Sequence, residues 1–595
     1  MIHRMCSAHI ATSCPRALDD AESGQGASGV GRAAGRRSSS PVFRIRSVSQ
    51  RFVAVVAGVL ALSMVACAQP QSDGSAATGG TLVFGATGAP KNFDPIFNDD
   101  GESFRVTQQL YDTLIAYAPG TTELAPGLAT TWQGSDDGKT WTFTLREGVK
   151  FHDGTSFDAA AVCANFDRWF NMTGAAAQDQ MIYYSGVFEG FARNQGTATG
   201  QPLYNSCVAL DARTAVIKFN KFKSAFPAAF GLFSLSISSP TALRRYNADH
   251  VTKNGDSFSY GDYANLHPTG TGAFKFESFD KARNTVTLVR NDDYWGEKAK
   301  VGRLIFKIIP DEYARKQELR AGTIDGYDLP SPADYASLKA DGMEVLVRQP
   351  FNLLYLGINQ KNNPALRDLR VRQALAYAIN RKALVHNKLP EGSEAVTQFM
   401  PSMVNGYADD VQQYPYDPQK AKDLLAQAGA SNLTLNFYYP TEVRRPYMPN
   451  PQDIFTLIAE DLRQVGITVN PVPRPWNGGY KDDVQQLGKH DLHLLGWVAD
   501  YNGADNFVGT FFGREKPEFG FNDSALFAAV AQADATPDRA AQAAAYQQLN
   551  RDIMAKFLPA VPIANLPPAV VVRSNIDGLV VSPLLDERFN TVSKR

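Results

Sequence analysis

Residues 124–154 have the sequence LAPGLATTWQGSDDGKTWTFTLREGVKFHDG. The run Asp136-Asp137-Gly138 inside it is typical of a tight turn between two antiparallel strands. After this turn, Trp141, Phe143 and Leu145 alternate with threonines, and a period of two belongs to a strand with one buried face. The stretch therefore predicts a β-hairpin that packs one face against a hydrophobic core.

On both sides of the hairpin, predicted strands and helices follow one another, which indicates an α/β protein. Residues 353–358 predict a strand that opens a second lobe, and residues 366–383 predict a long helix. Asp417-Pro418 predicts the start of another helix, with an N-cap and a proline in its first turn. Near the end, residues 561–572 are again β-like, as expected of a chain that returns to its first lobe.

The first 66 residues predict an N-terminal extension followed by an export signal. Residues 52–66 form an uninterrupted apolar run that follows several arginines and ends in small residues, as secretory signals do. A membrane-spanning helix needs about 20 apolar residues, so the run favours a cleaved signal over a permanent span. Residues 1–47 lack periodicity, and a translation start at Val42 or Val48 is one hypothesis for them.

Lipid attachment is predicted directly after this signal. The run Met64-Val65-Ala66-Cys67 resembles a bacterial lipobox, which implies cleavage before Cys67 and a lipid on its thiol. Residues 67–80 are rich in Gly, Ser, Ala and Pro and predict a flexible tether. We therefore expect an exported protein that a lipid anchor holds at the outer face of the cell membrane.

The charge of the chain argues against a nucleic-acid-binding protein. The 595 residues carry a formal net charge of −1, and the segment through Cys67 holds eight arginines against three acidic residues, so the remainder carries about −6. A mildly acidic body offers no basic face for nucleic acid.

Two cysteines remain in the exported body. Cys6 and Cys14 lie in the extension and Cys67 is the lipid site, which leaves Cys163 and Cys207. In an oxidising compartment such a pair predicts one disulfide, and two buried free thiols are the alternative. Two cysteines make no zinc site on their own.

Two loops place one cation and one anion beside aromatic side chains. One loop holds Arg445-Pro446-Tyr447, and the other holds Trp497 and Asp500. Between them, residues 451–466 predict a helix and residues 467–472 a short strand. The charges therefore follow successive strand ends of an α/β lobe, where open sheets usually bind ligands. Because an arginine fork suits a carboxylate, the pair suits a small zwitterion held by both ends.

Four stretches carry a family resemblance: residues 124–154, PTGTGAF at 268–274, RNDDYW at 290–295 and RVRQALAYAIN at 370–380. They resemble the family 5 solute-binding proteins of bacterial ABC importers, and the likeness covers essentially everything after the tether. The resemblance implies an α/β, two-lobed clamp of the periplasmic-binding-protein type II (cluster C), with an extra subdomain in the first lobe. We expect lobe I with its inserted subdomain at 81–350, lobe II at 351–562, and a return to lobe I at 563–595.

The motifs around the two charges resemble those of the dipeptide-binding branch of this family. By that resemblance, Asp500 holds the ammonium of a short peptide and Arg445 holds its carboxylate. The sequence after Trp497 resembles oligopeptide binders as much, so the ligand length stays open. Candidate aromatic walls of the site, each of which could equally be core packing, are Trp497, Tyr501 and Tyr447, with Tyr111 and Trp476 as further candidates.

The same resemblance implies the partners. Short peptides are the expected ligands, and a membrane permease with its ATPase receives them. We expect a monomer, because lobe closure and docking use both open faces. No cofactor and no metal are expected.

Other function classes remain as alternatives. Motifs of common hydrolases are absent from the sequence: it contains neither G-x-S-x-G nor H-E-x-x-H, so we expect no enzyme. An oligosaccharide binder of the same family would use aromatic platforms, but a neutral sugar does not need Arg445 and Asp500. Nickel-chelate or haem binding is a further alternative. His490 and His493 stand three apart in a predicted strand, so we expect their side chains on opposite faces.

Overall fold

The computed structural model describes residues 79–193, 201–255 and 257–595, which belong to one compact unit. The predicted extension and signal at 1–66, the lipidation site Cys67 and residues 67–78 of the predicted tether lie outside the described residues. Within the described ranges, no helix is both long and apolar enough to cross a membrane.

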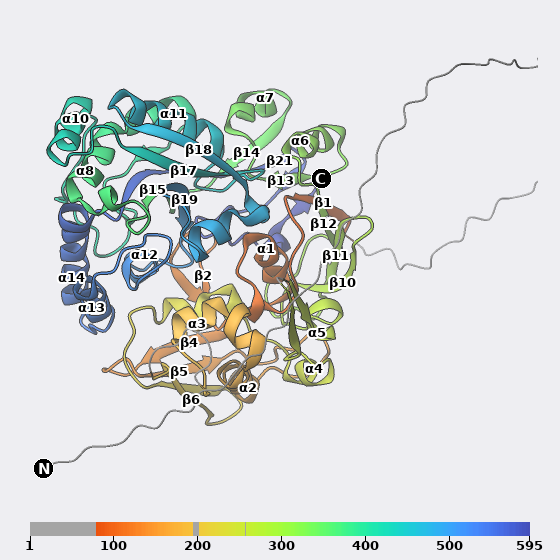
Figure 1. Cartoon of the computed structure of the whole chain (residues 1–595). Coiled ribbons are helices and arrows are strands. Elements are labelled where there is room, and N and C mark those ends of the chain that lie inside the picture. Colours follow the sequence, from red (N-terminus) through yellow and green to blue (C-terminus); the bar gives the residue numbers. More distant parts are fainter. Residues whose placement is uncertain (1–78, 194–200, 256) are drawn as a thin grey trace, which may run out of the picture. The chain divides into compact units, whose positions relative to one another are not determined.

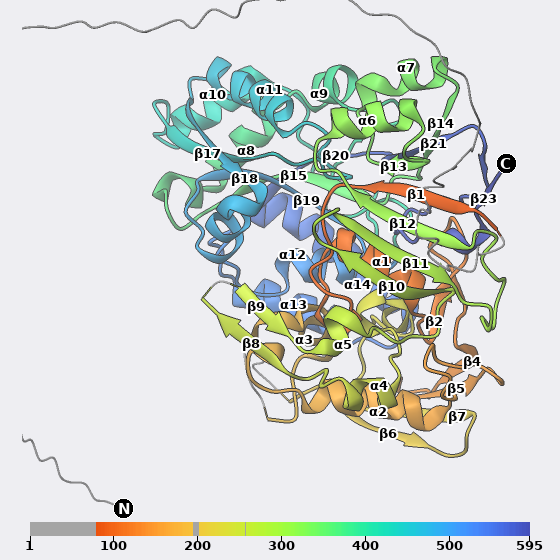
Figure 2. The same cartoon turned by 90° about the vertical axis from the view of Figure 1, so that its right-hand side faces the viewer.

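One large sheet joins the start of the described chain to a segment near its end. In spatial order, its seven strands are β10 (Phe274–Asp280), β11 (Thr285–Arg290), β12 (Arg303–Ile308), β1 (Thr81–Ala86), β13 (Gly326–Asp328), β21 (Ala569–Arg573) and β14 (Met343–Val347). Figure 2 shows β10, β11, β12 and β1 side by side. β1 is parallel to β12 and β13, whereas β21 is antiparallel to β13 and β14. The C-terminal return therefore supplies a strand to the first sheet.

The segments between the strands of this sheet form helices and short strand pairs. The helices are α1 (Gly101–Leu110), α3 (Ile182–Phe188), α4 (Pro240–Arg245), α5 (Asp262–Leu266), α6 (Glu312–Ala321) and α7 (Tyr335–Ala340). The strand pairs are β2 (Ile115–Tyr117) with β3 (Leu124–Pro126), β8 (Val251–Asn254) with β9 (Ser257–Tyr260), and β22 (Ile576–Asp577) with β23 (Ser593–Lys594). α1 contacts β10, and α6 and α7 contact β13 and β14.

A second large sheet takes all its strands from residues 352–565. In spatial order they are β16 (Glu394–Ala395), β20 (Ala560–Asn565), β15 (Asn352–Ile358), β19 (Leu492–Val498), β17 (Thr434–Thr441) and β18 (Thr468–Pro475). The predicted end of lobe II at 562 falls inside β20. This strand runs on to Asn565, which pairs with Glu394 of β16.

The same described part of the chain contains seven helices. They are α8 (Leu369–Ala378), α9 (Arg381–Lys388), α10 (Pro418–Gln427), α11 (Pro451–Gln464), α12 (Thr510–Phe512), α13 (Ser524–Asp534) and α14 (Arg539–Asp552). Of these, α8, α9 and α11 contact strands of the second sheet. α11 packs on β17 and β18, and α8 contacts both α10 and α11 (Figure 1). The chain passes between the two large sheets at residues 348–351 and again at 566–568.

The hairpin predicted from residues 136–145 is present in a smaller, four-stranded sheet. Its strands are β4 (Ala129–Gly134), β5 (Thr140–Leu145), β7 (Thr214–Phe219) and β6 (Tyr204–Ala209), in that spatial order. Gly138 has a φ of 62°, which is the left-handed backbone that the turn requires. The inward side chains of β5 are buried, as the alternation predicts.

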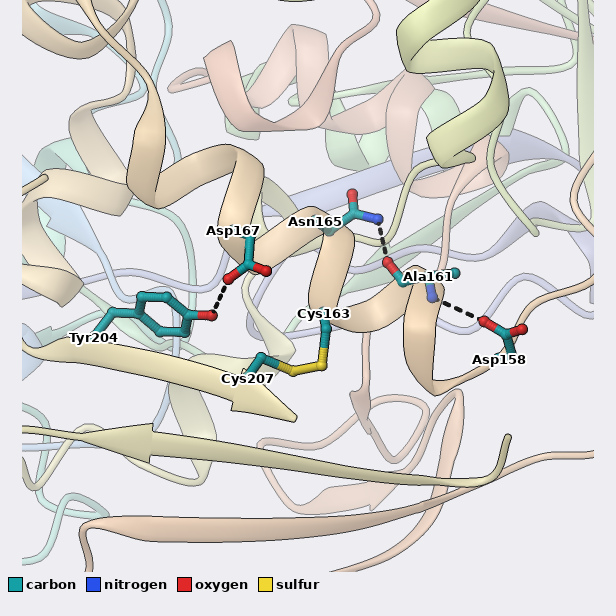
Figure 3. The surroundings of a disulfide bond; sticks show 7 residues. All are labelled: Asp158, Ala161, Cys163, Asn165, Asp167, Tyr204 and Cys207. Atoms are coloured by element: carbon teal, nitrogen blue, oxygen red, sulfur yellow. Dashed lines mark hydrogen bonds between the residues drawn. A yellow bond between two sulfur atoms is a disulfide. The ribbon is translucent and has the colours of Figure 1, made fainter. Parts of the chain in front are cut away.

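A disulfide connects this small sheet to the helix that covers it. Cys163 lies on α2 (Ala159–Asn171) and Cys207 on β6, with 5.0 Å between their Cα atoms (Figure 3). A hydrogen bond of 2.7 Å from the Tyr204 hydroxyl to Asp167 links the same two elements. Of the two alternatives that the sequence left open for these cysteines, the structure contains the disulfide.

Removal of this disulfide should destabilise the protein. The bond closes a loop with a sequence separation of 44, and cross-links of this length typically contribute about 2–4 kcal/mol. We expect the variant Cys163→Ser/Cys207→Ser to lose about that much in urea unfolding followed by circular dichroism. Ligand affinity should stay unchanged, because neither cysteine belongs to the candidate site. An unchanged unfolding midpoint would show that the disulfide does not contribute to the free energy of unfolding.

Candidate ligand-binding site

The predicted charges lie at the ends of neighbouring parallel strands. β17 is parallel to both β18 and β19, so the carboxyl ends of these three strands meet at one edge of the sheet. The loop with Arg445 follows β17, Trp476 follows β18, and Asp500 follows β19. Their placement after successive strand ends is therefore confirmed, and such edges are where open sheets bind ligands.

Asp500 is a half-buried carboxylate held by neutral groups. Its Oδ1 accepts a hydrogen bond of 2.8 Å from the hydroxyl of Tyr183 on α3, and its Oδ2 accepts one of 3.4 Å from Asn506 Nδ2. Among the described residues, no cation lies within ion-pair distance of it. Burial raises the pKa of Asp500 to about 6, although both hydrogen bonds oppose that rise. The carboxylate thus has no counter-charge from the part of the chain that the structure describes.

Asn506 connects Asp500 to Trp497. Its Oδ1 accepts from the Asp500 backbone N–H at 3.0 Å and from Trp497 Nε1 at 3.1 Å. Trp497 is half-buried, whereas Tyr501 is buried and its hydroxyl donates to Asp505. The indole and the carboxylate therefore keep a fixed relative orientation through one amide.

Arg445 stands beside the ring of Trp476. A two-residue turn fixes its backbone, since the Arg445 and Met448 backbones exchange hydrogen bonds of 2.9 and 3.0 Å. Its guanidinium carbon lies 5.2 Å from the ring centroid of Trp476, and Lys481 Nζ lies 5.7 Å from the same centroid. No described carboxylate is within ion-pair distance of Arg445, and its Nε is buried without a hydrogen-bond partner among those residues.

Tyr447 fills the space between this turn and β19. Only 4% of its surface is exposed, and a Cβ atom placed on Gly496 would lie 2.2 Å from its ring. The aromatic ring therefore packs directly on the backbone of β19, the strand that carries Trp497 and precedes Asp500. Burial raises the pKa of Tyr447, and the nearby Arg445 opposes the rise.

Two expectations from the sequence are wrong. Tyr111 is fully buried and its hydroxyl bonds to Phe93 O and to the Tyr263 hydroxyl, so it is a core residue. His490 and His493 do not point to opposite faces, because His490 lies ahead of β19 and their rings are 4.4 Å apart. Both Nε2 atoms bond to Glu518. The described residues contain no group of three or more metal-ligating side chains.

Three residues of the site were not predicted from the sequence. Tyr183 is separated from its partner Asp500 by 317 positions, and no local sequence pattern predicts a contact over that distance. Asn506 lies in a short irregular helix at Asp505–Gly509. Lys481 follows a second short irregular helix, Trp476–Tyr480. The spacing of residues in this segment does not predict that the Lys481 side chain lies beside Trp476.

The family follows from comparison with known sequences. The family model of the bacterial extracellular solute-binding proteins, family 5 (middle), matches residues 123–518. The chain belongs to this family.

Family 5 relatives match along most of this chain. It is 33% identical over 526 residues to the dipeptide-binding protein of Escherichia coli, covering 86% of this chain and 94% of the relative. It is 30% identical over 535 residues to heme-binding protein A of Haemophilus influenzae, covering 88% and 94%. The structure of the periplasmic binding protein DppA of Helicobacter pylori with the peptide STSA is similar, with a TM-score of 0.72, 28% identity and coverage of 87% and 98%.

These findings settle the class of this family 5 protein. It has the two-lobed, type II α/β clamp that the resemblance implied, and it is a solute-binding protein rather than an enzyme, as its relatives are.

Proposed function

We propose that the protein is the solute-binding component of an ABC importer, which captures short peptides by their charged termini and delivers them to a membrane permease. One observation carries the proposal. A half-buried carboxylate and a guanidinium, both without a counter-charge among the described residues, follow neighbouring parallel strands. A peptide zwitterion supplies the missing charge at each end.

Asp500 is assigned to the peptide ammonium. Its pKa of about 6 leaves it ionised at neutral pH but poorly solvated, because burial removes water and Tyr183 and Asn506 offer only neutral donors. An arriving ammonium brings both the opposite charge and further hydrogen bonds, which is the strong kind of contact. Tyr183 and Asn506 keep the carboxylate oriented while the site is empty.

Arg445 is assigned to the peptide carboxylate. The turn to Met448 fixes where its side chain begins, and the Trp476 ring lies beside the guanidinium. A planar guanidinium can donate two parallel hydrogen bonds to a carboxylate. Of the aromatic candidates, Trp497 is half-exposed, while Tyr447 and Tyr501 are buried. We assign Trp497 to direct contact with the ligand and the two tyrosines to the wall behind it.

The setting of this function is part of the proposal. We infer that the protein is exported and anchored by a lipid on Cys67, that it acts as a monomer, and that a permease with its ATPase is its partner. The lobes then correspond to residues 81–350 with the return after 565, and to residues 351–565, with ligand between them.

A ligand panel tests the function. Purified protein is heated with dipeptides, tripeptides and longer peptides, with cello-oligosaccharides, with nickel chelates and with haem. A ligand at 100 times its dissociation constant should stabilise the protein by about 2.7 kcal/mol. We expect stabilisation by free peptides alone. Stabilisation by sugars or nickel chelates alone would overturn the proposal.

Haem is the second candidate, because one relative is named a heme-binding protein. The haem propionates could bind Arg445, but haem offers no ammonium to Asp500. Haem binding that is insensitive to Asp500→Asn, together with no binding of peptides, would establish this candidate instead.

Peptide affinity should fall as the pH drops through about 6. Burial raises the pKa of Asp500 from 3.8 to about 6 in the ligand-free protein, and only the ionised carboxylate pairs with an ammonium. Below that pH the site must release a proton in order to bind, so affinity should fall by up to about tenfold per pH unit. Titration calorimetry across this range measures the effect. An affinity that stays flat from neutral pH down to about pH 4.5 would contradict the assignment.

A further inference from the structure

The second cation beside Trp476 is not explained by the binding of one carboxylate. Lys481 Nζ lies 5.7 Å from the centroid of the ring, and the Arg445 guanidinium carbon lies 5.2 Å from it. One C-terminal carboxylate is satisfied by a single arginine fork. Lys481 therefore remains available to a second group of the ligand.

Lys481 has no carboxylate partner among the described residues. It is half-buried, and no carboxylate in the described part of the chain lies within ion-pair distance of its ammonium. The acidic groups whose charge acts on Lys481, Asp99 and Asp100, are already engaged. Asp99 forms an ion pair with Lys91, and Asp100 caps α1 by accepting from the Glu102 and Ser103 backbones.

Burial and neighbouring cations destabilise the charged form of Lys481 while the site is empty. Burial and the neighbouring cations Lys91 and Arg445 lower its pKa, while Asp99 and Asp100 oppose this only in part. Two cations near one indole ring repel each other in a partly desolvated place, where charges interact more strongly than in water. An additional anion relieves this repulsion.

We propose that Arg445 and Lys481 together form a dianion subsite, which selects peptides with aspartate or glutamate as the C-terminal residue. Such a residue carries its α-carboxylate and its side-chain carboxylate on one unit. Arg445 binds the first and Lys481 the second, with the Trp476 ring beside both. This inference rests on the proposed function, and it names the substrate class of the same site.

The test compares two isosteric dipeptides. Titration calorimetry at low salt measures Ala-Glu and Ala-Gln on the wild-type protein and on Lys481→Gln. We expect the wild type to bind Ala-Glu about tenfold more tightly than Ala-Gln, which corresponds to about 1.4 kcal/mol. Lys481→Gln should remove that preference, so that the variant binds Ala-Glu and Ala-Gln with about equal affinity. The preference should weaken with added salt, because partly exposed charges are screened.

Two control variants test whether the preference for Ala-Glu depends on the charge of Lys481. Lys489→Gln removes an exposed cation that is paired with Asp483 at 2.7 Å, and it should keep the preference for Ala-Glu. Lys481→Arg retains the charge and should keep it too. If both dipeptides bind equally well to the wild type, or if the preference survives in Lys481→Gln, the dianion subsite is wrong while the proposed function stands. If no peptide of the ligand panel binds to the wild type, the proposed function itself fails.

Discussion

The substitution Asp500→Asn weakens peptide binding by roughly thirtyfold to several thousandfold, because losing one partner of a desolvated charge pair costs about 2–5 kcal/mol. The asparagine keeps the shape of the side chain and can still accept from Tyr183, so the fold is unaffected. What disappears is the negative charge that the ligand ammonium neutralises. Titration calorimetry with a dipeptide at neutral pH measures the loss.

The same substitution should leave the ligand-free protein as stable as the wild type, or more stable. The pKa of Asp500 is raised in the folded protein to about 6 from 3.8, so folding takes up a proton between these values. Stability from this group is therefore present at low pH and is lost as the pH rises through about 6. At neutral pH the buried charge destabilises the empty protein, and asparagine removes that effect.

Asp491→Asn is the matched control for this experiment. Asp491 lies just before β19, and burial raises its pKa as well, but its carboxylate accepts from the Asn436 backbone and has no place in the proposed site. Its substitution should leave peptide affinity unchanged. A wild-type affinity in Asp500→Asn, or an equal loss in Asp491→Asn, would refute the role given to Asp500.

The largest loss of stability is expected from Arg348→Met. Arg348 has no exposed side-chain surface and forms ion pairs with Asp328 at 2.8 Å and Glu587 at 2.7 Å. It thereby connects β13, the crossing at residues 348–351 and the C-terminal return. Removing it leaves buried carboxylates short of a partner, which typically costs about 3–5 kcal/mol. Arg105 also binds Asp328, so Glu587 is the group left uncompensated.

Urea unfolding measures this loss against a second arginine. Arg320 pairs with Asp341 at 2.6 Å, but both side chains are exposed to solvent, and such surface pairs contribute about 0–1 kcal/mol. Arg320→Met should therefore shift the midpoint little. Equal effects of the two substitutions would mean that the buried ion pairs do not hold these segments together.

Local sequence patterns predicted the elements whose structure depends on residues nearby in the sequence. The turn at Gly138 adopts the backbone that its glycine permits. Asp417 caps α10 and Pro418 occupies its first turn, as that dipeptide predicts. The helix and strand between the two charged loops, α11 and β18, lie close to their predicted positions. Each of these features is decided within a few residues of chain.

Contacts between distant segments decided the rest. The helix predicted over residues 366–383 is broken before Asn380, since the Asn380 side chain caps α9 and its backbone N–H donates to Asp461. The partner of Asp500 on α3 comes from a segment with no local signal. His490 and His493 meet because the strand begins only at Leu492. Sequence patterns thus located the charged loops, but not the groups that complete the site.

N-acetylation of the peptide removes the ammonium that Asp500 is proposed to hold. Titration calorimetry compares a free dipeptide with its N-acetylated form on the wild-type protein and on Asp500→Asn. We expect acetylation to weaken binding to the wild type by at least about thirtyfold and to have little further effect on the variant, because both changes remove the same interaction. Equal binding of the free and acetylated dipeptides to the wild type would show that Asp500 does not hold the ammonium.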